Sequence, residues 1–133
     1  MLTIGLTGSQ TERVTPDRTA ASVGSGLLPV YATPAMIALM ERTASELVAP
    51  FLREGEATVG TSIEVKHLAA TPEGMEVRCQ CVLTAIDRRR LTFAIEVFDA
   101  VGLVGTATHD RFIVDTARFM AKAASRREEA GLL

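Results

Sequence analysis

The chain has 133 residues, of which 47% are hydrophobic and 23% are charged, and its formal net charge is −2. This length and composition predict one globular domain, residues 1–133, with a substantial core. The small negative charge gives no electrostatic basis for binding nucleic acid or an acidic membrane surface. No apolar run reaches the ~20 residues of a membrane helix, and we find no secretory signal at the N-terminus. We therefore expect a cytoplasmic protein.

The two cysteines, Cys79 and Cys81, are two positions apart in a predicted strand. We expect their side chains on opposite faces of that strand, which argues against a disulfide between them and against a shared metal ion. Two reduced cysteines in a half-buried strand is the favoured interpretation, and it agrees with a cytoplasmic location. The sequence predicts no metal site.

An edge-like strand is predicted within residues 2–15, where Thr, Ile, Leu and Val alternate with smaller residues. Pro16 and Asp17 end it. Residues 17–29 contain two glycines and several small side chains, which is typical of a mobile loop or lid. Leu27 and Leu28 are its only large apolar residues.

The chain is organised around a long helix that begins at Thr33 and Pro34 and is closed by Pro50. Thr33 suits the N-cap position and Pro34 the first helical position. The helix is apolar nearly all round, which predicts burial on more than one side. Glu41 is unexpected on this apolar helix, because burial of an ionised carboxylate is costly unless the carboxylate is paired with a cation or takes part in catalysis.

Four further strands and a charged amphipathic C-terminal helix follow the long helix. Turn signals separate them, and a tip of three arginines, Arg88 to Arg90, lies between the second and third of these strands. Short links favour antiparallel pairing, so one sheet wrapped around one central helix is the expected architecture. This is the hotdog fold of the α+β class. The expected strands are residues 58–68, 75–87, 91–99 and 103–116, and the helix is residues 117–127.

Thr33, Glu41 and His67 are the candidate catalytic residues. Each has an ordinary alternative, since Thr33 can act only as a cap, Glu41 can pair with a nearby cation, and a lone histidine is more often structural. Together they supply a hydroxyl, a general base or nucleophile, and a group that exchanges protons near neutral pH. The helix N-terminus and the backbone near Gly60 can present N–H donors to an oxyanion. This combination predicts hydrolysis of an activated acyl group.

The sequence resembles the fluoroacetyl-CoA thioesterase family of hotdog proteins over roughly residues 30–123. In that family a Thr at the helix start, a Glu in the helix and a His after the next strand form the catalytic set, and a Gly lies close to the acyl group. Those positions correspond in type and order to Thr33, Glu41, His67 and Gly60. The motifs that carry the resemblance are residues 30–33, 36–41, 59–61, 67–72, 88–91 and 105–111.

The resemblance implies an acyl-CoA thioesterase that acts as a homodimer, with its sites at the dimer interface. Coenzyme A enters as part of the acyl-CoA substrate, and no other cofactor is expected. The expected substrate-binding residues are Gly60, Leu27, Leu28, Met36 and Arg111. Family members that handle fluoroacetyl-CoA carry a longer lid with phenylalanine, whereas residues 16–29 contain none. The acyl group is therefore left open.

The mechanism implied is attack on the thioester carbonyl by Glu41, or by a water that Glu41 activates, with His67 as acid or base and Thr33 orienting. The sequence does not separate the two routes. Two other functions stay open: a non-catalytic acyl-CoA-binding hotdog module, and a hotdog hydratase or dehydratase.

The second histidine, His109, is interpreted as structural. Arg111, Arg118, Lys122 and the Arg88 to Arg90 tip are candidates for contacts with the phosphates of coenzyme A, because phosphate recognition favours arginine. Such a tip is more often only a solvated turn.

Overall fold

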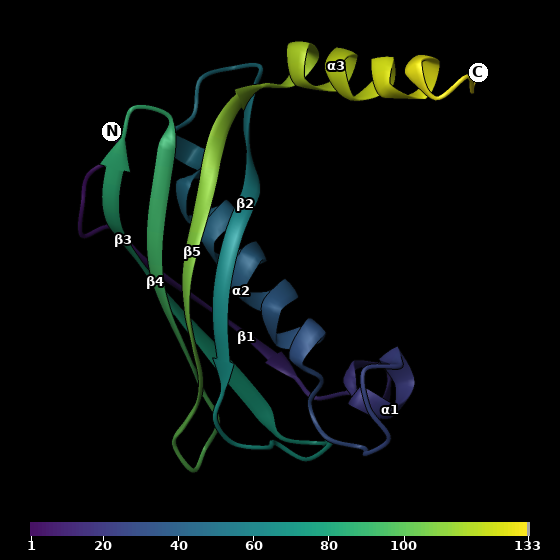
Figure 1. Ribbon diagram of the computed structural model, residues 1–133. Helices are drawn as coiled ribbons and strands as arrows, with labels where there is room; N and C mark the ends of the chain where they lie inside the picture. The colour runs from purple at the N-terminus through teal and green to yellow at the C-terminus, as the bar shows by residue number, and fades with distance from the viewer. Residues whose placement is uncertain (133) are drawn as a thin grey trace.

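The computed structural model describes residues 1–132, so Leu133 of the expected domain lies outside the described residues. Five antiparallel strands form one sheet in the order β1-β3-β4-β5-β2, and the sheet curves around helix α2 (Figure 1). The predicted hotdog fold is confirmed. The elements are β1 (Thr7–Arg13), α2 (Thr33–Val48), β2 (Glu56–His67), β3 (Glu76–Asp87), β4 (Arg90–Phe98), β5 (Leu103–Asp115) and the C-terminal helix α3 (Thr116–Glu129).

The ends of β2 to β5 lie within two residues of the expected ones, and β1 is shorter than the predicted 2–15. β1 lies at one edge of the sheet, as expected, and β2 lies at the other. The core lies between α2 and the concave face of the sheet. It contains Met36, Leu39 and Met40 of α2 together with Phe93 and Ile95 of β4, all essentially buried.

The expectation that the Cys79 and Cys81 side chains lie on opposite faces of the strand was wrong, whereas the prediction of two free cysteines is confirmed. Cys79 and Cys81 of β3 are both buried, and so are Val77 and Leu83, while Arg78 and Gln80 between them are exposed. Side chains alternate along a strand with a period of two, so positions two apart share a face. Both thiols point into the core, and both cysteines are free. Burial raises the pKa of the Cys81 thiol to about 12, which keeps it protonated.

The start of α2 also differs from the expectation. Ala32 is the N-cap, Thr33 is the first helical residue, and the helix has no side-chain cap hydrogen bond. Pro34 follows within the first turn, where a missing N–H costs little. The Thr33 hydroxyl is therefore available to a residue outside the helix.

The expected loop at residues 17–29 contains structure of its own. A 3₁₀ turn, η1 (Pro16–Arg18), precedes one turn of helix, α1 (Ala20–Val23). The segment folds back on itself, because the Ala20 N–H donates to the Val30 carbonyl at 2.8 Å and the Ala21 N–H to the Leu28 carbonyl at 3.1 Å. We call residues 16–32 the lid.

Helix α3 leaves the end of β5 and projects away from the rest of the molecule (Figure 1). None of its residues is buried. It begins at Asp115, whose carboxylate accepts the Arg118 backbone N–H at 2.9 Å. Among the described residues, no helix is long and apolar enough to cross a membrane.

Candidate active site

Two clusters of polar side chains lie along β2. The first, the histidine cluster, consists of Thr33, Tyr31 and His67, where α2 begins and β2 ends. The Thr33 hydroxyl and Nδ1 of His67 are 2.7 Å apart. The Tyr31 ring meets the imidazole edge-on, with ring centroids 6.4 Å apart. The sequence pattern does not show this contact, because Thr33 and His67 are 34 residues apart.

Nε2 of His67 is buried and has no hydrogen-bond partner within the described residues. Buried polar atoms are nearly always paired, so an orphan nitrogen of this kind requires an explanation. Burial also lowers the pKa of His67, because removal from water disfavours the charged imidazolium. The imidazole is therefore neutral at pH 7 and able to accept or pass on a proton.

The histidine cluster opens into a pocket of about 360 Å³. Its walls come from the lid, the start of α2 and the residues that follow β2. The lining residues are Ala20, Ser25, Val30, Tyr31, Thr33, His67, Leu68, Ala69 and Ala70.

The second cluster, the carboxylate cluster, consists of Glu41, Gly60, His109 and Arg111. Gly60 is necessary for its geometry, because a Cβ at this position would lie 2.9 Å from Oε2 of Glu41 and 3.2 Å from Cε1 of His109. The Glu41 side chain is 44% exposed, so its carboxylate is accessible to solvent as well as to Arg111, whose Nη1 lies 3.9 Å from Oε2.

Arg111 and His109 form a closed hydrogen-bond network behind Glu41. The Arg111 guanidinium donates to the Thr58 hydroxyl at 2.9 Å and to the Thr58 carbonyl at 3.0 Å. A third N–H of Arg111 points to Nε2 of His109 at 3.2 Å. Nδ1 of His109 donates to the Ser62 carbonyl at 2.8 Å, which leaves Nε2 as the acceptor. His109 therefore fixes Arg111.

Burial lowers the pKa of His109, and the nearby Arg111 lowers it further. Both effects keep the imidazole neutral, which its two hydrogen bonds require. The sequence interpretation of His109 as a structural histidine agrees with this geometry. Arg111, expected among the substrate-binding residues, is 7% exposed and is held by protein groups.

The two clusters do not meet within one chain. Thr33 and Glu41 are eight residues apart in α2, which corresponds to about 12 Å along the helix axis. Gly60 and His67 are seven residues apart on β2, which corresponds to roughly 20 Å. The single chain therefore brings Thr33 to His67, and Gly60 to Glu41, but leaves the carboxylate far from the imidazole.

The remaining expected site residues lie outside both clusters. Leu27 and Leu28 are 93% and 65% exposed, and neither lines the pocket beside His67. Met36 is fully buried, and its sulfur occupies the space where Gly105 lacks a side chain. Tyr31 was not singled out from the sequence. The Tyr31 hydroxyl donates to Glu12 of β1 at 2.5 Å. This contact is long-range in sequence, so no local pattern predicts it.

Comparison with known proteins gives a consistent result. The model of the fluoroacetyl-CoA-specific thioesterase family matches residues 14–117. A fluoroacetyl-CoA thioesterase of Streptantibioticus cattleyicolor is 39% identical over 93 residues, which are 70% of this chain and 67% of that protein.

Solved structures agree with the sequence comparison. A crystal structure of a fluoroacetyl-CoA thioesterase superposes with a TM-score of 0.89 at 30% identity, over 94% of this chain and 97% of its own. A thioesterase superfamily member of Thermus thermophilus superposes with a TM-score of 0.88 at 30% identity, over 98% of each chain. The chain therefore belongs to the fluoroacetyl-CoA-specific thioesterase family, a group of hotdog-fold enzymes that hydrolyse acyl-CoA thioesters.

Proposed function

We propose that this protein hydrolyses the thioester of a small acyl-CoA as a homodimer, with each active site built from two subunits. Glu41 is the base or nucleophile, supplied by the carboxylate cluster of one subunit. His67 is the acid or base and Thr33 the orienting hydroxyl, both supplied by the histidine cluster of the other. Coenzyme A takes part only as a portion of the substrate, and we propose a cytoplasmic location.

The observation that carries this proposal is the position of both clusters on one edge strand. Within residues 1–132, β2 pairs only with β5, so its other edge is open over 12 residues. Long open edges invite pairing with a second chain. If β2 pairs antiparallel with its own copy about an axis through Glu64, the extra residue between Gly60 and Ser62 brings Gly60 opposite His67 of the partner subunit. The same two-fold symmetry repeats the arrangement at the second site.

This pairing also gives the unpartnered nitrogen of His67 a role. Nε2 of His67 would face the carboxylate cluster of the other subunit, where Glu41 is half exposed and Gly60 leaves room for a substrate. Thr33 holds the opposite nitrogen, Nδ1, and so fixes the orientation of the ring. A carboxylate and an oriented neutral imidazole on two sides of a gap suit acyl transfer.

The proposed reaction balances without a cofactor. Glu41, or a water that Glu41 deprotonates, forms a bond to the thioester carbon, and backbone N–H groups near Gly60 stabilise the oxyanion. The carbon–sulfur bond then breaks. When water is the attacking group, its proton passes to Glu41 and then, through the neutral His67, to the departing thiolate. By the nucleophilic route the thiolate leaves first, water then hydrolyses the Glu41 anhydride, and His67 takes the proton of that water and transfers it to the thiolate. A relative has been solved with fluoroacetate and CoA, at 31% identity and a TM-score of 0.84 over 89% of this chain, which supports acyl-CoA as the substrate class.

Thiol release from a panel of short acyl-CoAs tests the activity, and mixed dimers test the shared site. Glu41→Ala and His67→Ala homodimers should each lose at least ~10²-fold in kcat. Co-expression of the two variants produces heterodimers that contain one intact site and one doubly damaged site. A statistical mixture should therefore recover roughly a quarter of the wild-type rate.

Two results would contradict the proposal in different ways. No thiol release from any acyl-CoA would remove the hydrolase assignment. Full activity losses in the single variants, with no recovery in the mixture despite proven heterodimers, would place Glu41 and His67 in sites that do not cross the interface. Co-expression of two copies of the Glu41→Ala chain with different tags is the matched control, and it should recover nothing.

A further inference from the structure

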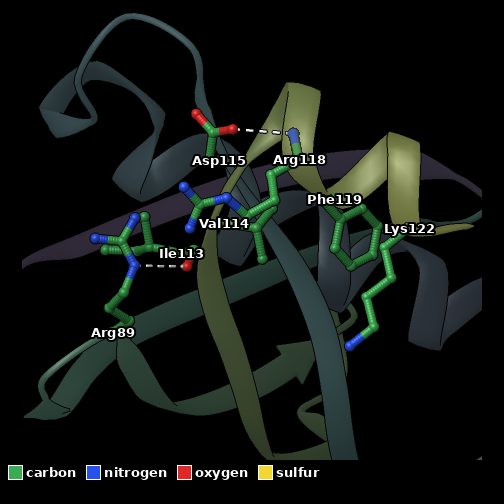
Figure 2. Close-up of a pocket in the computed structure, with 7 residues that line it drawn as sticks. All are labelled: Arg89, Ile113, Val114, Asp115, Arg118, Phe119 and Lys122. Atoms are coloured by element: carbon green, nitrogen blue, oxygen red, sulfur yellow. Dashed lines mark hydrogen bonds between the residues drawn. The ribbon is translucent and has the colours of Figure 1, made fainter.

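A cationic groove lies where α3 leaves β5, away from both clusters. Its volume is about 580 Å³. Figure 2 shows that its walls come from the tip between β3 and β4, the end of β5 and the first turns of α3. The lining residues are Arg89, Ile113, Val114, Asp115, Arg118, Phe119 and Lys122.

Two of its cations are free to bind a ligand. Within residues 1–132, the Arg118 guanidinium and the Lys122 ammonium make no hydrogen bond or ion pair, although the Arg118 backbone is bonded to Asp115. Arg89 is anchored instead, because it bonds Glu56 at 2.7 Å and the Ile113 carbonyl at 3.0 Å. The groove thus combines one rigid cation with two available ones.

The neighbouring hairpin tip adds further positive charge. Arg88 has a φ of 57°, a left-handed conformation for which glycine and asparagine are the usual residues in a hairpin turn. Arg88 and Arg90 line a second hollow that shares Arg89 and Ile113 with the groove. In a chain whose net charge is −2, five cations line these two hollows against two carboxylates, Asp87 and Asp115. Arg90 pairs with Asp87 and Arg89 with Glu56, so the unpaired positive charge lies on Arg88, Arg118 and Lys122. Such a concentration favours an anionic ligand.

The groove lies within reach of the carboxylate cluster. Arg111 and Asp115 are four residues apart on β5, which corresponds to about 13 Å, and Arg118 and Lys122 lie in the first two turns of α3. Ile113, halfway along this path, packs against the core on the same face as Arg111. An extended pantetheine arm covers a distance of this order.

We propose that this groove binds the phosphorylated nucleotide of the acyl-CoA whose thioester lies at the carboxylate cluster. Arg118 and Lys122 bind the phosphates, since guanidinium and ammonium groups form charge-assisted hydrogen bonds with phosphate oxygens. Phe119, which is 40% exposed, presents an aromatic face to the adenine. This inference rests on the proposed function only for the position of the thioester.

The double variant Arg118→Gln/Lys122→Gln tests the groove with two substrates that carry the same acyl group. For the acyl-CoA, KM should rise roughly tenfold, because two solvent-exposed contacts to the phosphates are lost, while kcat stays unchanged. For the acyl-pantetheine thioester, which lacks the nucleotide, KM should not change. The matched control is Arg126→Gln/Arg127→Gln, which removes two charges from the same helix outside the groove and should behave as wild type.

Titration calorimetry with adenosine 3′,5′-bisphosphate separates this inference from the proposed hydrolysis. The wild type should bind this probe, and Arg118→Gln/Lys122→Gln should weaken binding by roughly tenfold, whether or not any thioester is cleaved. Equal KM changes for both substrates, or equal weakening by the control variant, would overturn the groove as a nucleotide site. Absence of hydrolysis together with intact nucleotide binding would overturn only the proposed function.

Discussion

The carboxylate cluster and the histidine cluster lie on the same edge strand but differ in how completely the chain satisfies them. Arg111 directs donors to Thr58 and His109, and His109 uses both ring nitrogens. His67 has one bonded nitrogen and one buried nitrogen without a partner. In the carboxylate cluster the polar groups behind Glu41 are hydrogen-bonded to one another. In the histidine cluster one nitrogen of His67 needs a partner from another group. This contrast is the basis of the proposal that two subunits share each site.

The largest effect is expected from filling the space at Gly60. In Gly60→Ala, the new methyl group would lie 2.9 Å from the Glu41 carboxylate, and the flexible carboxylate would move rather than the backbone. A displacement of about 1 Å in a catalytic group costs on the order of 10²-fold in rate. We expect kcat to fall by that amount while Tm changes little, measured by thiol release and thermal unfolding.

Gly8→Ala is the matched control. Gly8 of β1 is also a strand glycine, and a methyl group there would lie 2.9 Å from the end of the Leu47 side chain. It is remote from both clusters, so its kcat should equal that of the wild type. If Gly60→Ala and Gly8→Ala showed the same rate, the carboxylate cluster would have no part in the chemistry.

A smaller effect is expected at the histidine cluster. Thr33→Val keeps the shape of the side chain but removes the hydroxyl that bonds His67 at 2.7 Å. One hydrogen bond that orients a catalytic ring is worth about 1–2 kcal/mol, so kcat should fall roughly tenfold. Thr33→Ser retains the hydroxyl and should restore most of the rate. Equal rates for the two variants would show that the hydroxyl does not orient His67.

The pattern of the sequence was sufficient to predict the fold. Alternation in the strands, the Thr33-Pro34 start and the turn signals predicted the sheet, the helix and their order. These features depend on local periodicity, which one sequence displays directly. The two cysteines were misplaced because the period of the strand was misapplied, and the structure corrects their placement.

The contacts between the candidate site residues could not be predicted from the sequence. The contact of Thr33 with His67 depends on how the lid and β2 meet in space, and the network of Arg111 with Thr58 depends on the register between β2 and β5. No local pattern encodes either one. The exposure of Leu27 and Leu28 was also unforeseen, because the sequence does not show that the lid folds back through its own hydrogen bonds.

The smallest effect concerns the pH dependence of stability, and it compares the two histidines directly. Both have a lowered pKa in the folded state, chiefly because of burial, so the unfolded chain binds protons that the folded chain does not. The contribution of the two neutral histidines to the free energy of unfolding is therefore fully present above the ordinary histidine pKa of about 6.5. It is lost as the pH falls from there toward the lowered pKa values. Urea unfolding at pH 7.5 and 5.5 measures this loss.

His109→Gln should reduce the loss of stability between pH 7.5 and 5.5. It should also lower stability at pH 7.5, because His109 is 1% exposed and supports Arg111. His67→Gln should reduce the same loss with a smaller cost at pH 7.5, because that ring leaves one nitrogen unpaired. An unchanged pH dependence in the variant with both substitutions would show that other groups control acid stability, and the contrast between the two clusters would then have to rest on the kinetic tests alone.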